Sequence, residues 1–385
     1  MRILALSYEY PPLGGGGGVA LAHSARAWAA LGHQVTLVTS GATGLAAYEQ
    51  LGSVALYRLP VLARHARATA SLASLLSFPL AALNFVGKQQ WQRSDFDLIL
   101  SGFAIPSGVA GVILARAWRR PHVVWVMGGD AYDPSKRLSP HRLPLLKQTV
   151  AQVLNRSQAI ITMSHDMAQR VAQIYRPATP IHVVPQGLAL APYAPQPRSG
   201  GPVTVVCVAR LVRRKRMAEL VQAVAELPPQ SVRLIIVGEG PQYGPLQELI
   251  ASHALSDRVQ LVGYVSDEEK LALLRCADIF ALVSEHEGFG LVYLEAAAQG
   301  LPIVAGRVGG QTDFLRHGVT GWLVAHDQPR QLKAALAALV AQPALRAWMG
   351  QQALQMAQRY EITRVADDFL KVLYDTEQRW KTFAA

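Results

Sequence analysis

The feature that most constrains this chain is an alternation of short apolar, β-branched runs with helical segments. The alternation occupies the first half of the sequence, stops near residue 190 and starts again near residue 203. Strands that alternate with helices form parallel sheets covered by helices. A chain of 385 residues also exceeds what one such core usually holds. We therefore predict an α/β fold with two doubly wound domains.

The periodicity places the predicted elements as follows. In the first half, strands are predicted at residues 2–7, 34–39, 97–101, 122–127, 159–163 and 182–185. Helices are predicted at residues 19–31, 106–118 and 164–175, the last with Ser164 as its N-cap. In the second half, strands are predicted at residues 203–209, 233–237, 259–261, 279–283 and 303–305, and a final amphipathic helix at residues 359–380.

The domain boundary is predicted from composition. Residues 191–202 contain four prolines and a Gly-Gly pair, which is typical of a linker. The first domain is then expected over residues 1–190 and the second over residues 203–358. Residues 359–385 are expected to form a C-terminal helix that packs back on the first domain.

The cysteines and the N-terminus bear on the compartment. Cys207 and Cys276 are far apart in the sequence and lie in apolar runs, so both are predicted to be buried thiols of a reduced compartment. The first residues run directly into a strand pattern without a small-residue cleavage site, so we expect no signal peptide. These patterns favour a cytoplasmic protein.

The net charge of +11 is concentrated in the first half of the chain. Residues 1–190 carry 17 lysines and arginines against 7 acidic residues, whereas residues 191–385 carry 20 against 19. Residues 68–87 contain no charged side chain, but their serines, asparagine and proline disfavour a membrane span. A helix buried in the first domain, or one in peripheral contact with an anionic membrane, fits better. A basic surface that only maintains solubility is the alternative.

Five consecutive glycines, Gly14–Gly18, lie between the first strand and the first helix. Glycines at the start of a helix allow the backbone to approach a phosphate group closely. The pattern differs from a dinucleotide fingerprint, because the second strand ends in Thr39 and Ser40 without an acidic residue. A flexible loop would show the same glycines.

A basic cluster, residues 210–215, directly follows the first strand of the second half. Doubly wound folds bind ligands at the carboxyl ends of their strands. Arg210 there would form paired hydrogen bonds with a diphosphate, while Lys215 would add a point charge. A solvated loop is the other interpretation of such a charge run.

The third cluster, residues 285–295, joins a strand to a helix that is expected to begin near Leu291. The backbone N–H groups of Phe289, Gly290 and Leu291 would be helix-start donors. Glu287 lies in the loop and Glu295 about one turn into the helix. Two carboxylates at this spacing would bind sugar hydroxyls, although ordinary loop and helix-face roles fit the spacing as well.

Taken in order, these motifs resemble the retaining glycosyltransferases of the GT-B fold in glycosyltransferase family 4. The matching segments span nearly the whole chain, at residues 11–18, 32–35, 184–187, 210–215, 237–241, 263–265, 287–295 and 309–321. The resemblance implies two Rossmann-like domains that face each other across a cleft. It also implies transfer of a hexose, with retention, from a UDP- or GDP-linked sugar to a glycan, lipid-linked or small-molecule acceptor.

The resemblance implies roles for individual residues. Glu287 would be the catalytic-site carboxylate on the transferred sugar, and Glu295 would bind the ribose. The other donor-binding residues would be Gly17, Gly18, Arg210, Lys215, Gly238, Val265, Phe289, Gly290 and Leu291. The resemblance also implies that the enzyme needs no metal ion or cofactor.

The chain departs from the family pattern on the acceptor side. The family commonly has His-Gly-x-Asp where this chain has Met127-Gly128-Gly129-Asp130. Methionine cannot replace the hydrogen bonds of histidine, so Met127 and Asp130 are the acceptor-side candidates whose chemistry differs most. His122, His165 and His286 are expected to be structural or surface residues.

Three other functions were compared with this one. A nucleotide-sugar epimerase on a similar fold would need acid–base residues at the sugar, where Met127 offers none. A nucleic-acid-binding protein would fit the charge, but no ladder of aromatic and basic residues is present, and we expect no nucleic-acid partner. A catalytically inactive relative would not need to keep both Glu287 and Glu295.

Overall fold

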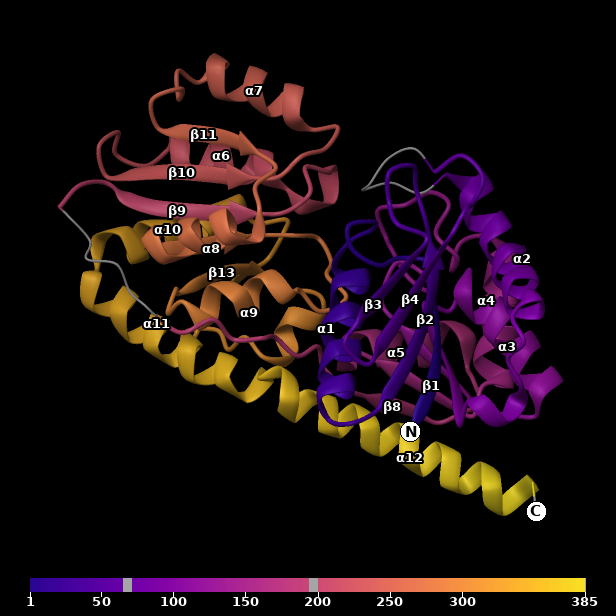
Figure 1. Cartoon of the computed structure of the whole chain (residues 1–385). Coiled ribbons are helices and arrows are strands. Elements are labelled where there is room, and N and C mark those ends of the chain that lie inside the picture. The colour runs from indigo at the N-terminus through magenta and orange to yellow at the C-terminus, as the bar shows by residue number, and fades with distance from the viewer. Residues whose placement is uncertain (65–70, 194–199, 385) are drawn as a thin grey trace. The chain divides into compact units, whose positions relative to one another are not determined.

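The computed structural model describes residues 1–64, 71–193 and 200–384. Residues 68–70 of the charge-free segment and residues 194–199 of the predicted linker lie outside this range. The chain divides into two compact units (Figure 1). Unit 1 comprises Met1–Ala189 with Ile362–Ala385, and unit 2 comprises Leu190–Glu361. Each unit is built on its own sheet, and the prediction of two doubly wound, Rossmann-like α/β domains is confirmed.

The sheet of unit 1 has, within the described residues, the strand order β3-β4-β2-β1-β5-β6-β7-β8. The strands are β1 (Arg2–Ser7), β2 (Gln34–Ser40), β3 (Tyr48–Leu51), β4 (Val54–Leu59), β5 (Leu98–Gly102), β6 (His122–Val126), β7 (Ala159–Thr162) and β8 (Ile181–Val183). All neighbouring strands are parallel except β3 and β4. The central strands are buried on both faces because helices cover both, which explains their continuous apolar sequences.

Helices cover both faces of this sheet (Figure 1). They are α1 (Gly16–Ala30), α2 (Leu72–Lys88), α3 (Ser107–Trp118), α4 (Pro144–Arg156), α5 (His165–Tyr175) and α12 (Ile362–Ala384), with a 3₁₀ turn η1 (Arg93–Asp95). The Ser164 hydroxyl accepts a hydrogen bond from the backbone N–H of Met167, so the predicted N-cap of α5 is confirmed.

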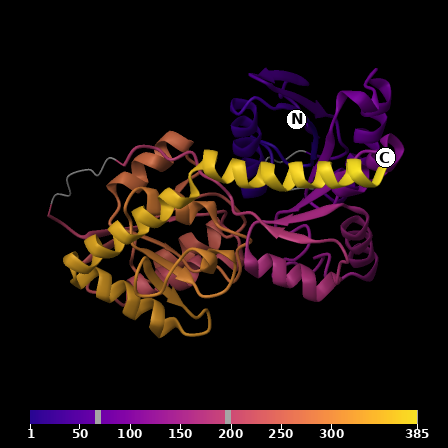
Figure 2. The same cartoon turned by 90° about the horizontal axis from the view of Figure 1, so that it is seen from below.

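The C-terminal helix α12 lies along unit 1 (Figure 2). Its Phe369 ring is buried between Trp28 of α1 and Trp125 of β6, with ring centroids 4.9 and 4.7 Å away. The helix begins later than predicted, because Glu361 has an extended backbone and residues 358–360 form a separate 3₁₀ turn, η4 (Gln358–Tyr360). Burial of aromatic surface therefore holds the end of the chain on the first unit.

The sheet of unit 2 has, within the described residues, the order β11-β10-β9-β12-β13-β14, and all its strands are parallel. The strands are β9 (Val203–Val208), β10 (Val232–Val237), β11 (Val259–Gly263), β12 (Ile279–Leu282), β13 (Ile303–Gly306) and β14 (Gly321–Val324). The α-helices are α6 (Met217–Ala225), α7 (Tyr243–Ser252), α8 (Asp267–Cys276), α9 (Leu291–Ala298), α10 (Pro329–Ala341) and α11 (Pro343–Ala357), and the 3₁₀ turns are η2 (Arg213–Lys215) and η3 (Gly310–Asp313). The order reverses direction between β9 and β12, so the loops after these strands lie at the switch point where such sheets bind ligands.

Two predictions about buried segments were wrong or incomplete. Cys207 is buried in β9, but Cys276 is exposed at the end of α8, because its position falls on the outer face of that helix. Most of the described part of the charge-free segment lies in α2, which buries Phe78, Ala82 and Val86 against the rest of unit 1. Within the described residues, none of the helices is long and apolar enough to cross a bilayer.

Candidate active site

The loop between β12 and α9 is shaped to present its backbone. Gly290, the N-cap of α9, has φ +96°, and a β-carbon there would lie 2.5 Å from the Tyr293 ring. Both facts require glycine. The Phe289 side chain is buried against Phe314, with ring centroids 5.0 Å apart. Because Phe289 is buried, the end of this loop presents its main-chain groups, and the helix-start N–H groups at residues 289–291 are suited to anionic oxygen atoms.

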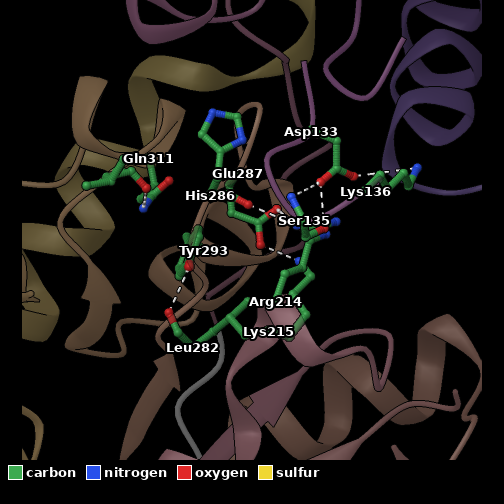
Figure 3. Close-up of polar contacts among 11 residues, drawn as sticks. Asp133, Ser135, Lys136, Arg214, Lys215, Leu282, His286, Glu287, Tyr293 and Gln311 are labelled. Atoms are coloured by element: carbon green, nitrogen blue, oxygen red, sulfur yellow. Dashed lines mark hydrogen bonds and ion pairs between the residues drawn. The ribbon is translucent and has the colours of Figure 1, made fainter. Parts of the chain in front are cut away.

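The carboxylate of Glu287 meets two cations from the loop after β9 (Figure 3). Lys215 forms a hydrogen-bonded ion pair with Glu287, and Nη1 of Arg214 lies 3.7 Å from Oε2 of Glu287. All three side chains are largely buried. Arg214 also donates to the carbonyl of His286 at 2.9 Å, and the N–H of Glu285 donates to the Arg214 carbonyl at 2.8 Å. The two loops are thus joined by charge and by backbone hydrogen bonds.

These contacts fix the ionisation state of Glu287. Burial by itself would raise the pKa of this carboxyl group, but the charges of Lys215 and Arg214 outweigh it and lower the pKa to about 2. Burial lowers the pKa of Lys215, and Glu287 opposes that change. Glu287 is consequently an anion at neutral pH. It accepts hydrogen bonds and does not act as an acid there.

A glycine turn holds Glu287 from the other side. Gly309 has φ +120°, and a β-carbon there would lie 2.7 Å from the backbone nitrogen of Glu287. The N–H of Gly310 donates to the Glu287 carbonyl at 2.8 Å. Gln311, fully buried, donates to the carbonyls of Gly306 and Val308 at 2.7 and 2.9 Å. The turn after β13 therefore sets the backbone from which the Glu287 carboxylate projects.

The loop after β10 packs directly on the basic loop. Gly238 has φ +137°, and a β-carbon there would lie 1.9 Å from the Ala209 carbonyl oxygen. Leu211 donates to the Glu239 carbonyl at 2.8 Å, and Gly238 donates to the Gly263 carbonyl at 2.8 Å. Gly238 thus allows three consecutive loop segments to lie side by side, with Val265 two residues beyond the last of them.

The structure distinguishes among the predicted cations and identifies further residues. Lys215 contacts Glu287, whereas Arg210 is exposed. Arg214 belongs to the predicted basic cluster, but sequence reasoning assigned it no role. Glu295 lies on α9 as predicted, and its Oε1 is 3.0 Å from Nζ of Lys270 on α8. No local sequence pattern predicts the contact between Lys270 and Glu295, because these residues lie on helices of successive βα units.

The glycine run in unit 1 forms the first turn of a helix. Helix α1 begins at Gly16, three residues before the predicted start, and the Gly15 N–H donates to Oε2 of Glu9 at 2.8 Å. A β-carbon on Gly17 would lie 2.8 Å from the Phe103 ring and 3.0 Å from the sulfur of Met127. A β-carbon on Gly18 would lie 3.1 Å from Glu9. Close packing is therefore sufficient to explain these glycines, alongside the predicted phosphate contact.

Asp130 organises the loop after β6. One of its carboxylate oxygens accepts from the Ala104 N–H at 2.6 Å and the other from the Met127 N–H at 3.1 Å. Burial raises its pKa to about 6, and hydrogen bonds from the backbone N–H groups oppose this rise. Both Asp130 and Met127 are largely buried. The described contacts of Asp130 therefore serve the loop, and its acceptor-side role stays a prediction.

The structural role predicted for His122 is confirmed by its side-chain contacts. Both ring nitrogens of His122 lie 2.9 Å from serine hydroxyls, Ser157 and Ser101, and burial lowers its pKa to about 3. The carbonyl of His286 is bound by Arg214. Over the described part of the chain, no group of three or more histidine, cysteine, aspartate or glutamate side chains could hold a metal ion.

Two family models match the chain in succession. The model for a glycosyl transferase 4-like domain matches residues 15–187, and the model for glycosyl transferases group 1 matches residues 194–356. The two matches follow the two units closely, and the second contains the whole Glu287 site.

Individual relatives agree with the models. The chain is 30% identical to D-inositol 3-phosphate glycosyltransferase of Pseudarthrobacter chlorophenolicus, over 72% of this chain and 70% of the relative. It is 29% identical to GDP-mannose-dependent alpha-(1-6)-phosphatidylinositol monomannoside mannosyltransferase of Mycolicibacterium smegmatis, over 66% of this chain and 70% of the relative. Sucrose-phosphate synthase of Thermosynechococcus elongatus shares the fold, with a TM-score of 0.83, 22% identity and coverage of 97% and 99% of the two chains.

The fold is therefore GT-B, the architecture of glycosyltransferases with two Rossmann-like domains. This chain belongs to the group 1 glycosyltransferases, glycosyltransferase family 4. It is an enzyme that transfers a sugar from a nucleotide-sugar donor.

Proposed function

We propose that unit 2 binds the donor around the Glu287 site, as a UDP- or GDP-linked hexose. Lys215 and Arg210 would neutralise the diphosphate, with Gly238 and Val265 near the base, and the helix-start N–H groups at residues 289–291 would contact the phosphate and the sugar. Glu295 would bind the ribose. The observation that carries this proposal is the buried Glu287 carboxylate, which two cations keep ionised beside a helix start.

The chemistry proposed for this arrangement is transfer with retention and without a metal ion or cofactor. The bond from the anomeric carbon to the diphosphate oxygen breaks, and a bond from that carbon to an acceptor hydroxyl oxygen forms on the same face. The proton of the hydroxyl group goes to the departing phosphate oxygen. Lys215 would stabilise the negative charge that develops on this phosphate, and Glu287 would hold hydroxyl groups of the transferred sugar. Phosphate contacts by Gly17 and Gly18 stay a prediction.

The donor experiment uses the full-length chain and calorimetric titration with UDP, GDP and ADP. We expect one nucleoside diphosphate to bind in the micromolar range and to raise the melting temperature, because a ligand of the folded state stabilises it. Replacement of Lys215 by methionine should weaken this binding at least tenfold through the loss of a charge-assisted contact. Absence of binding for all three nucleotides would overturn the proposal. The anomeric configuration of the product, read by NMR, tests retention.

The acceptor is proposed to be anionic and linked to a lipid. The two relatives named above act, by their names, on an inositol phosphate and on a phosphatidylinositol mannoside. In unit 1, the segment between β6 and α4 exposes Lys136, Arg137 and Arg142. Cations on a loop at the carboxyl end of a parallel strand are placed to attract a phosphate-bearing acceptor.

Unit 1 also carries an apolar surface that supports peripheral membrane contact. Leu72, Leu76 and Leu80 follow one another at four-residue spacing along α2 and are 61%, 64% and 70% exposed. Near the start of α4, Leu138 and Leu145 are 65% and 75% exposed beside the cations of the same loop. Leucines next to basic side chains are typical of proteins that bind an anionic leaflet from one side. We therefore propose that this enzyme works in the cytoplasm, in peripheral contact with the inner face of the cell membrane.

The membrane proposal is tested with sedimentation of phosphatidylglycerol vesicles at low salt. We expect binding that falls when the anionic lipid is replaced by phosphatidylcholine. Replacement of Leu72, Leu76 and Leu80 by serine should reduce binding by at least about tenfold, because even one leucine that enters the bilayer contributes about 1.5 kcal/mol. The matched control position is Trp348, an exposed apolar residue of unit 2. A buried residue such as Leu255 would not serve as a control, because serine there would disturb the fold. Equal binding by the wild type and the triple variant would overturn the proposal.

A further inference from the structure

The carboxylate of Glu295 is held in place by a lysine from a different helix. Oε1 of Glu295 lies 3.0 Å from Nζ of Lys270 on α8. The same ammonium group lies 2.9 Å from Oδ1 of Asp267, one turn earlier on α8. The side chains of Lys270 and Glu295 are only 22% and 18% exposed. The pair is therefore shielded from solvent much more than an ordinary surface ion pair.

The place of Lys270 on α8 is well defined. The helix begins with a capping box, in which Ser266 accepts from the Glu269 N–H and Glu269 accepts from the Ser266 N–H at 3.2 and 2.7 Å. Lys270 follows in the next position. A capping box fixes the first turn of a helix, so the direction in which Lys270 leaves the backbone is set locally. The side chain of Lys270 therefore has a defined position next to Glu295.

The recorded contact involves one oxygen of Glu295. With Oε1 bound by the ammonium group, the rotation of the carboxylate is restricted and Oε2 keeps its acceptor capacity. A ribose offers two adjacent hydroxyl groups, and both need acceptors at a fixed separation. A carboxylate whose orientation is fixed before binding loses less conformational entropy when it binds such a diol.

We propose that Lys270 is a positioning residue that orients Glu295 for recognition of the donor ribose. This inference rests on the proposed function, in which Glu295 binds the ribose of a nucleotide sugar. Lys270 acts through Glu295 and does not itself contact the reacting atoms. The competing role is purely structural, an ion pair that joins α8 to α9 without effect on the ligand.

The experiment is a thermodynamic cycle on the full-length chain. Calorimetry measures the affinity of wild type, K270M and K270R for UDP and 2′,3′-dideoxyuridine diphosphate, and for the corresponding guanosine pair. The affinity of the wild type should fall about tenfold or more when the ribose hydroxyls are absent, because one or two good hydrogen bonds are lost. K270M should bind the normal nucleotide about tenfold more weakly and discriminate less than threefold between the two. K270R, which keeps the charge, should recover most of the discrimination.

Two further variants keep the test decisive. K333M removes a lysine from the exposed ion pair with Glu226 in the same unit, at 2.8 Å, and should leave affinity and discrimination unchanged. The double variant K270M/E295Q should bind like E295Q alone, because both changes disrupt one interaction. K270Q replaces K270M if the methionine variant melts early.

The outcomes separate the two proposals. If wild type discriminates between the nucleotides and K270M discriminates equally well, the inference about Lys270 is wrong while the donor proposal stands. If wild type binds a nucleoside diphosphate but ignores the ribose hydroxyls, the ribose assignment of Glu295 is wrong, and that of Lys270 with it. If wild type binds none of the nucleotides, the proposed function itself fails.

Discussion

The loops that contain Glu287 and Asp130 bury a carboxylate by different means. In unit 2, the charges of Lys215 and Arg214 compensate the burial of Glu287 and hold its pKa at about 2. In unit 1, Asp130 has only backbone N–H groups as recorded partners, and burial raises its pKa to about 6. The full charges of neighbouring cations outweigh the effect of desolvation on the pKa of a buried carboxyl group, whereas the dipoles of peptide N–H groups do not.

The difference indicates how each loop can be used. In the proposed donor site, the cations around Glu287 would accommodate more negative charge, since a diphosphate would share Lys215 while Glu287 turns to neutral hydroxyl groups. The carboxylate of Asp130 is engaged by the loop itself, between Ala104 and Met127. In this proposal the Glu287 loop exchanges partners with a ligand, whereas the hydrogen bonds of Asp130 maintain the shape of its own loop.

The largest expected effect is on transfer activity. Replacement of Glu287 by glutamine keeps the shape but removes the charge, and we expect kcat to fall at least about 100-fold. Replacement of Asp130 by asparagine, the matched change in the other loop, should lower kcat by less than about tenfold, because the amide oxygen still accepts from a backbone N–H group. Both are measured as initial rates at saturating donor. A larger loss from the Asp130 variant would reverse the comparison.

The next effect concerns stability. Replacement of Glu287 by alanine leaves Lys215 buried without its carboxylate, and we expect a loss of about 3 kcal/mol in the free energy of unfolding. The double variant E287L/K215M removes both charges and should recover most of this loss. Urea unfolding monitored by fluorescence measures both. If the double variant is less stable than E287A, the two side chains do not form the interdependent pair that we describe.

The smallest effect is a dependence of stability on pH. The pKa of Asp130 is raised in the folded state, so its protonation stabilises the fold at low pH, and this contribution is lost as pH rises through about 6. The pKa of Glu287 is lowered, so its contribution is present above its unfolded value of about 4.5 and is lost only as pH falls toward 2.

When the pH is lowered from 7 to 5, the free energy of unfolding of the wild type should therefore rise by about 1 kcal/mol relative to that of D130N. E287Q should show no such difference from wild type over this interval, because Glu287 stays ionised throughout. Chemical denaturation at the two pH values gives both numbers. If the difference in free energy of unfolding between wild type and D130N is the same at pH 7 and pH 5, Asp130 is ionised at both pH values.

Part of the site was predictable from local patterns, because its glycines and helix starts are local requirements. Helix α9 begins at Leu291, where the sequence predicts a helix start, with Gly290 as its N-cap, and Glu295 follows about one turn later. Lys215 was identified from its place after a parallel strand. Arg214 and Lys270 were not assigned roles, because their partners are 73 and 25 positions away and depend on how loops and helices meet.

The sequence by itself determined the two α/β units and the strand ends at which polar side chains gather, because period, glycine conformation and helix capping act within a few residues. Only the tertiary structure decided that Arg214 as well as Lys215 faces Glu287, that Lys270 reaches Glu295, that Cys276 is exposed and that α1 begins within the glycine run. These outcomes depend on the rotation of each helix and on the reach of each side chain. Both are set by packing between segments distant in sequence, which no local pattern encodes.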